Sequence, residues 1–190
     1  MSLSSVNQII VQAAEVVNSG GVIAYPTEGV FGLGCNPDNT LAVEKVLHLK
    51  NRSIDKGLIL LAGDFSQVQK YIDETAITAE QMTTILSRWP NAITQVLPVK
   101  KSVPKLLRGV FNSIAVRVTA HPDVIALCDR TGGAIVSTSA NLSGNPSALT
   151  WQQVLAQFPN ELDGIIKSET LGATTSSTII DGLTGQILRG

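Results

Sequence analysis

Residues 135–147 read Ile-Val-Ser-Thr-Ser-Ala-Asn-Leu-Ser-Gly-Asn-Pro-Ser, a short apolar run that passes into a stretch dense in hydroxyl side chains. Gly132 and Gly133 precede the apolar run, so residues 134–136 are expected to form a buried strand that starts after a turn. Thr150, followed by Gln153, predicts a capping box that opens a helix downstream. The hydroxyl-rich stretch therefore follows the carboxyl end of a strand, the edge at which open α/β sheets bind ligands.

The side chains of this stretch have the chemistry of an anion site. Hydroxyl and amide groups donate hydrogen bonds to phosphate or carboxylate oxygens, and Gly144 lets backbone N–H groups approach as well. The alternative is a turn whose side chains bond their own backbone. The residues with this chemistry are Ser137, Ser139, Asn141, Ser143 and Ser147.

The 190 residues are enough for one substantial core, so a single domain is expected over residues 1–190. The longest apolar run, residues 58–62, is too short to cross a bilayer, and the first residues carry no export signal. Cys35 and Cys128 match no metal or redox spacing, which predicts reduced thiols in a cytoplasmic protein. A membrane role is therefore not expected.

The charge of the chain argues against a protein that coats nucleic acid through bulk electrostatics. The formal net charge is −1, whereas domains of that kind are usually strongly basic. Aromatic residues make up 4% of the chain, which leaves few side chains on which bases could stack. Any anion site must therefore be local.

Helical and strand patterns alternate along the rest of the chain. Helices are expected over residues 6–17, 41–49, 65–72, 78–89, 122–131 and 151–158. Strands are expected over residues 22–25, 58–61, 93–99, 114–118, 134–136 and 164–166, with a hairpin formed by 176–181 and 186–189. This order predicts an α/β fold with a twisted sheet of parallel and antiparallel strands flanked by helices.

A second polar segment follows the strand expected over residues 22–25. The glycines of residues 29–34 are spaced G-x-x-G-x-G, which matches neither the dinucleotide-binding fingerprint nor a P-loop. Thr27 and Glu28 still stand at the end of a strand, and this makes them candidates for a site, with a plain turn as the alternative.

Cations gather at two places, and a solvated face is the usual explanation of such clusters. Three stand directly before the strand expected at residue 58: Lys50, Arg52 and Lys56. The second cluster consists of Lys100, Lys101, Lys105 and Arg108. Arg117 differs from both, because it lies within an apolar strand, where an unpaired charge would cost several kcal/mol. It must pair with an internal carboxylate or face a cleft that receives an anion.

Several catalytic classes lack their residues here. The chain has no HExxH, no Cys/His ligand spacing and no G-x-S-x-G, and His48 and His121 are isolated. The remaining candidates are cations and hydroxyls, which suit phosphoryl or nucleotidyl transfer by positioning and charge neutralisation. They are Lys50, Arg52, Lys56, Arg117, Arg189, Thr27, Ser113, Ser137, Ser139, Ser147 and Ser177. Glu28 and Asp181 could assist a metal that bridges phosphates, but no all-protein metal cage is visible.

Five segments in this order together resemble one family. They are residues 25–34 (YPTEGVFGLG), 50–52 (KNR), 114–122 (IAVRVTAHP), 137–144 (STSANLSG) and 177–181 (STIID). The resemblance spans nearly the whole chain and is to the YrdC family, the threonylcarbamoyl-AMP synthases. Five ordered segments make it specific, whereas each alone would be weak.

The resemblance implies a twisted α/β fold with a concave cationic cleft. It implies that L-threonine, bicarbonate or CO2, and ATP give L-threonylcarbamoyladenylate and pyrophosphate, with Mg²⁺ carried by ATP. The product would serve the N6-threonylcarbamoyl modification of adenosine 37 in ANN-decoding tRNAs, after transfer by separate downstream proteins. The alternative function is an RNA-binding or ribosome-assembly factor that uses the cleft as a clamp.

The resemblance also implies roles for individual residues. Threonine would be held by Thr27, Arg117, Ser137 and Ser177. The ATP side would be lined by Lys50, Arg52, Lys56, Ser113, Ser139, Asn141, Ser147 and Arg189, with Lys50 and Arg52 as the catalytic cations. One departure concerns Leu61, which stands near the place of a histidine in many relatives.

Overall fold

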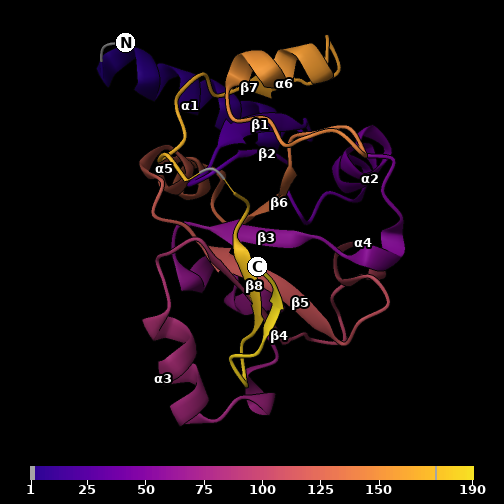
Figure 1. Cartoon of the computed structure of the whole chain (residues 1–190), viewed down its shortest axis with the longest axis vertical. Coiled ribbons are helices and arrows are strands. Elements are labelled where there is room, and N and C mark those ends of the chain that lie inside the picture. Colours follow the sequence, from indigo (N-terminus) through magenta and orange to yellow (C-terminus); the bar gives the residue numbers. More distant parts are fainter. Residues whose placement is uncertain (1–2, 174) are drawn as a thin grey trace.

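A computed structural model describes residues 3–173 and 175–190, and in this part of the chain nine strands form one sheet (Figure 1). The strand order is β7-β1-β2-β6-β3-β5-β4-β8-β9. The strands are β1 Ile23–Pro26, β2 Phe31–Gly34, β3 Ile59–Ala62, β4 Ile93–Pro98, β5 Ser113–Val118, β6 Ile135–Ser139, β7 Gly164–Ile165, β8 Thr178–Asp181 and β9 Ile187–Arg189. Three neighbouring pairs, β1/β7, β3/β5 and β4/β8, are parallel and the others are antiparallel. The expected mixed sheet is confirmed.

Helices cover the sheet, as the hydrophobic periodicity predicts. They are α1 Leu3–Asn18, α2 Thr40–Leu49, α3 Ala79–Ser87, α4 Lys105–Arg108, α5 Pro122–Thr131 and α6 Trp151–Gln157. Successive residues of β3 point to opposite faces of the sheet. Leu60 packs in the cluster that contains Val46 of α2, whereas Leu61 packs with Val17 of α1 and Leu127 of α5. The helices therefore bury both faces of the central strand.

The prediction of one helix over residues 65–72 is wrong. The structure has two 3-10 turns there, Phe65–Gln67 and Gln69–Tyr71. The Asp64 side chain accepts from the backbone of the first turn, and the Gln67 side chain returns to the N–H of Asp64, so the turn is closed at both ends within four residues. Ile72 then bridges to Val99 in extended conformation, which ends any helix.

Strand β2 was not expected from the sequence, because a run of glycines is typical of a loop. Its backbone pairs with β1 on one side and with β6 on the other. A side chain at Gly34 would collide with the carbonyl oxygen of Val136 and lie 2.8 Å from the ring of Tyr25. Glycine is thus required here for close approach, not for a turn.

Other boundaries differ less. Strand β6 continues to Ser139, so the first hydroxyls of residues 137–147 belong to the sheet, and α4 occupies part of the basic loop expected over residues 100–109. The Thr150 side chain caps α6, but Gln153 bonds the N–H of Leu149, so the capping box is incomplete. The single domain over residues 1–190 stays a prediction.

Candidate active site

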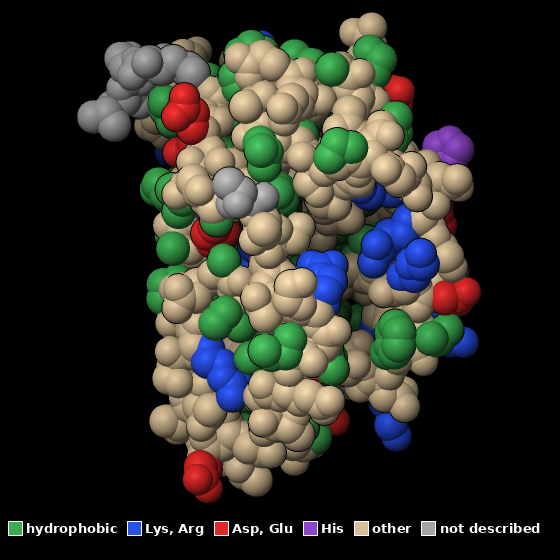
Figure 2. All heavy atoms as spheres, in the orientation of Figure 1, with side chains coloured by type: hydrophobic (Ala, Val, Ile, Leu, Met, Phe, Trp, Pro, Cys, Tyr) green, Lys and Arg blue, Asp and Glu red, His purple; other side chains and the backbone are tan. Residues whose placement is uncertain are grey.

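The sheet carries a cavity of about 510 Å³ on the face of its central strands. Its floor includes one row of residues paired across four strand junctions, in the order Ser137, Ile59, Ala115, Val96 and Asp181. All five line the cavity, because residues opposite each other in a sheet project to the same face. In the space-filling view, Lys and Arg side chains gather around the hollow in the middle of the molecule (Figure 2).

Three hydroxyl side chains and one buried arginine belong to the lining of the cavity. Thr27, Arg117, Ser137 and Ser177 line it and are buried, with 4–7% of their surface exposed. The Thr27 hydroxyl donates to the carbonyl of Val30 at 2.7 Å, and the Ser177 hydroxyl shares a 2.7 Å hydrogen bond with Thr94. Tertiary structure therefore brings together the four residues expected to hold threonine, from positions 27 to 177.

Arg117 satisfies both alternatives that the sequence left open. Its Nη2 atom lies 3.4 Å from Oε2 of Glu28, and its side chain also lines the cavity. Glu28 is fixed in turn, because its Oε1 accepts from the Thr119 hydroxyl at 2.6 Å and from the N–H of Ala120 at 3.0 Å. Burial alone would raise the pKa of Glu28, but Arg117 and these two donors outweigh it and lower the pKa. Glu28 therefore provides a buried negative charge that offsets part of the charge of Arg117.

Four further cations line the same cavity: Arg52, Lys56, Arg108 and Arg189. Arg52 donates to the carbonyl of Gly57 from Nε at 3.2 Å and from Nη2 at 2.8 Å. A guanidinium has five N–H donors, so several remain for a ligand. Burial, followed by the repulsion of the nearby Arg189, lowers the pKa of Arg52. An anionic ligand in the cavity would offset part of the repulsion among these cations.

Three residues assigned to the ATP side do not line the cavity: Lys50, Asn141 and Ser147. Lys50 is buried and donates to Ser139 and Asn141, whereas Ser147 is half-buried. Burial, followed by the repulsion of Arg52, lowers the pKa of Lys50 to about 8. The other expected residues of this side, Arg52, Lys56, Ser113, Ser139 and Arg189, do line the cavity.

Some lining residues were not assigned from the sequence: Arg108, Phe111, Ser176 and Leu188. Ser176 precedes the assigned Ser177, just before β8, and Leu188 precedes the assigned Arg189 in β9, so adjacency in the sequence was the available signal. Arg108 belongs to the second basic cluster, but nothing in that cluster distinguishes it from its neighbours. Its guanidinium bonds the carbonyls of Val103 and Phe111 at 3.0 and 2.7 Å, which directs it to the cavity.

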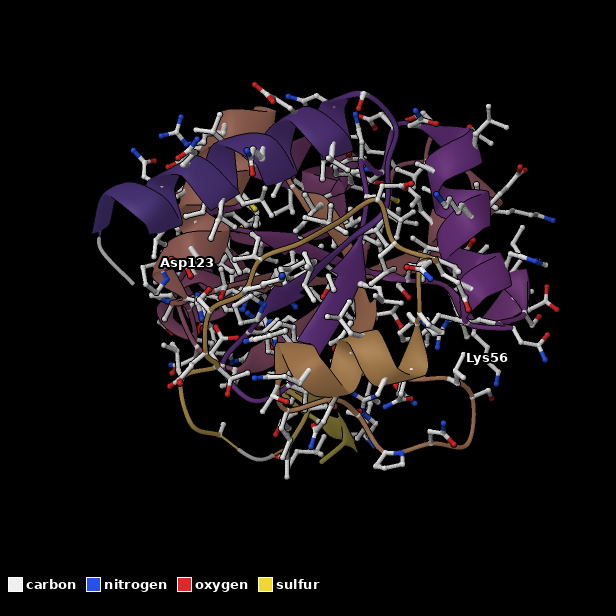
Figure 3. All side chains as sticks on the ribbon, turned by 90° about the horizontal axis from the view of Figure 1, so that it is seen from above. Lys56 and Asp123 are labelled. Atoms are coloured by element: carbon white, nitrogen blue, oxygen red, sulfur yellow. The ribbon has the colours of Figure 1, made fainter. Side chains whose placement is uncertain are left out.

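His121, His48 and Leu61, which the sequence analysis singled out, all lie outside the lining of the cavity. The ring of His121 caps α5, accepting from the N–H of Asp123 at 3.3 Å, and His48 is exposed on α2. Leu61 is fully buried in the core. Asp123 lies on the opposite side of the molecule from Lys56 (Figure 3).

Residues 3–173 and 175–190 contain no group of three or more His, Cys, Asp or Glu side chains placed to hold a metal. No helix in these ranges is long and apolar enough to span a membrane. Phosphate-bound Mg²⁺ needs no such cage, since it is held largely by substrate oxygens.

The fold and the cavity define an α/β protein with several Lys and Arg side chains around a hollow on its sheet. The chain belongs to the Sua5/YciO/YrdC family, whose description reads "Telomere recombination" and whose pattern matches residues 15–190. A Vibrio cholerae protein named threonylcarbamoyl-AMP synthase is 46% identical over 178 residues, which cover 94% of this chain and 95% of that protein.

Solved structures of proteins named Sua5 and YciO are also similar to this chain. Pyrococcus abyssi Sua5 in complex with L-threonine has a TM-score of 0.83 and 32% identity, over 92% of this chain and 51% of that one. This chain thus spans about half the length of P. abyssi Sua5. Escherichia coli YciO has a TM-score of 0.77 and 25% identity, over 97% of this chain and 91% of that one.

Proposed function

We propose that this chain synthesises L-threonylcarbamoyladenylate from L-threonine, bicarbonate or CO2, and ATP, with release of pyrophosphate. The observation that carries the proposal is the cavity itself. It joins a buried arginine and three hydroxyls to a group of four cations, so one space can hold a carboxylate and a polyphosphate. The relatives named threonylcarbamoyl-AMP synthase support this reading.

Threonine would bind at the Arg117 end of the cavity. The guanidinium would pair with its carboxylate in the two-pronged geometry that arginine favours. Thr27, Ser137 and Ser177 would contact the remaining polar groups. Glu28 would keep Arg117 in place, because a buried carboxylate restricts where the guanidinium can lie.

The chemistry then needs alignment more than a protein nucleophile. The threonine amine adds to CO2 and loses a proton, which gives a carbamate. A carbamate oxygen attacks the α-phosphorus of ATP, a new P–O bond forms, and the bond to the β-phosphate oxygen breaks as pyrophosphate leaves. Arg52, Lys56 and Arg189 would neutralise the charge that develops on the departing pyrophosphate. Mg²⁺ would enter bound to the phosphates. Asp181 lines the cavity, and its carboxylate could assist in holding this metal.

The product is a reactive mixed anhydride, and it must be consumed by a group-transfer reaction. We propose that separate cytoplasmic proteins transfer the threonylcarbamoyl group to adenosine in tRNA. Direct RNA binding by this chain would be weak.

The test is to incubate purified protein with ATP, bicarbonate and labelled threonine. We expect pyrophosphate together with an adenylate that carries the label. Folded protein that yields neither product would disprove the proposal.

A further inference from the structure

Lys50 follows α2, and its ammonium group contacts the last residue of β6 and the loop after it. Nζ donates to the carbonyl of Ser139 at 2.7 Å, to Oδ1 of Asn141 at 2.9 Å, and to the carbonyl of Asn141. An ammonium group has three N–H donors, so these contacts occupy all of them. The residue is 7% exposed and does not line the cavity. Lys50 thus has no free donor for a phosphate oxygen.

The orientation of the Asn141 amide follows from its other contacts. Its Nδ2 donates to the carbonyls of Leu142 and Asn145 at 3.0 and 2.8 Å. Its Oδ1 therefore faces Lys50 and the Ser139 hydroxyl, and the Ser139 Oγ lies 2.6 Å from it. An amide oxygen only accepts, so the single hydroxyl hydrogen of Ser139 must be donated to Asn141.

This arrangement sets what Ser139 can offer to a substrate. Its Oγ lines the cavity with lone pairs available and its hydrogen already used. Ionised phosphate oxygens are themselves acceptors, so they cannot bond to it. Its partner must instead be a donor, such as a hydroxyl or amine of the substrate, or a cation.

We propose that Lys50 is a positioning residue, which acts through Asn141 to fix the loop after β6 and to present the Ser139 hydroxyl as an acceptor. This role rests on the proposed function, since it concerns the synthesis of the adenylate. Arg52 differs, because it lines the cavity and would meet the phosphates of the proposed substrate directly. Removal of the Lys50 ammonium would leave one oxygen at the end of β6 and two in the loop without their charged donor, and the loop would shift.

A double-mutant cycle tests the connection. Lys50→Met and Asn141→Ala are made singly and together, and kcat/KM for ATP is measured from pyrophosphate release. Each single change should lower kcat/KM by about tenfold or more, and the pair should lose no more than about threefold beyond the worse single variant, because both break the same link. Losses that multiply would overturn the proposal.

Pyrophosphate binding gives a readout without turnover. Calorimetry without divalent cations compares the wild type with Arg52→Ala, Lys50→Met and Ser139→Ala, and Lys101→Met is the control for loss of an exposed charge. Arg52→Ala should weaken binding by about tenfold, and the other variants should stay within about threefold of the wild type. Equal weakening by Lys50→Met and Arg52→Ala would mean that Lys50 touches phosphate, and would refute the proposal.

Thermal melts control for folding. If Lys50→Met does not fold, the cycle is run on Asn141→Ala and Ser139→Ala, which keep the lysine, and the proposal again requires losses that do not multiply. A wild type that makes no adenylate would disprove the proposed function. The pyrophosphate comparison would still test the role of Lys50.

Discussion

Arg52 and Lys101 are two cations of this chain with different surroundings. Arg52 lines the cavity, whereas Lys101 is exposed and lies outside it. If Arg52 binds the phosphates as proposed, Arg52→Ala should cost on the order of 2–4 kcal/mol of transition-state stabilisation, because a preorganised charge is lost from the site. Lys101→Ala should change activity by less than about threefold, the scale of a solvated charge. The measurement is pyrophosphate release at saturating threonine.

Thermal melts belong to the same comparison. Arg52 bonds one acceptor in the described part of the chain, the carbonyl of Gly57, so its removal should lower stability by only about 1–2 kcal/mol and leave the fold intact. If Lys101→Ala lost most of its activity and Arg52→Ala kept nearly all of it, the active cleft would lie elsewhere in the molecule.

Glu28 links the site to pH-dependent stability. Its pKa is lowered in the folded state, since Arg117, Thr119 and Ala120 outweigh the opposite effect of burial. A lowered pKa contributes stability above the unfolded-state pKa, and this contribution is lost as the pH falls through the folded-state pKa. Glu28→Gln should therefore destabilise the protein by about 2–4 kcal/mol near neutral pH, because it leaves Arg117 buried without a counter-charge.

Urea denaturation at neutral and acidic pH measures this effect. The difference between Glu28→Gln and the wild type should shrink as the pH falls below the ordinary range of a glutamate, about 4. Glu161→Gln is the matched control, since Glu161 is exposed. A difference that does not change with pH would contradict the assignment.

Among the elements, β2 depends most on close approach. The Cβ of Gly34→Ala would collide with the carbonyl of Val136 in β6 and press on Tyr25 in β1. The three strands would have to separate, and we expect a loss of about 1–3 kcal/mol in the free energy of unfolding. Gly133→Ala has open space around its Cβ and should change stability by less than about 0.5 kcal/mol. Urea midpoints compare the two, and equal stabilities would mean that β2 does not pack as described.

At the level of the whole molecule, charge limits RNA binding. The net charge is −1, so long-range attraction to a polyanion is absent, and the cavity cations provide only local contacts. Binding of tRNA should be weak at physiological ionic strength and should fall steeply with added salt. A tRNA titration at two salt concentrations measures this. Sub-micromolar affinity that survives salt would favour the RNA-clamp function.

The elements with strong local signals were predictable from the sequence. Helices α1, α2 and α5 and the hairpin β8–β9 lie within a few residues of their expected bounds, because periodicity, caps and turn residues are encoded locally. Strand β2 and the 3-10 turns near residue 68 were not predictable in this way. Strand β2 depends on pairing with two neighbouring strands, and the first 3-10 turn depends on side-chain caps. Tertiary context overrode local propensity in both places.

The candidate site also has a part that the sequence predicts and a part that only the tertiary structure decides. The sequence is sufficient for the residue types of an anion site, for the α/β class and for the requirement that Arg117 have a partner. The three-dimensional structure selects Glu28 as that partner, adds Arg108 and Phe111 to the cavity, and turns Lys50 toward Asn141. The reason is physical: composition and periodicity report which groups are present and which face is buried. Contacts between residues about ninety positions apart arise only when the sheet sets its register.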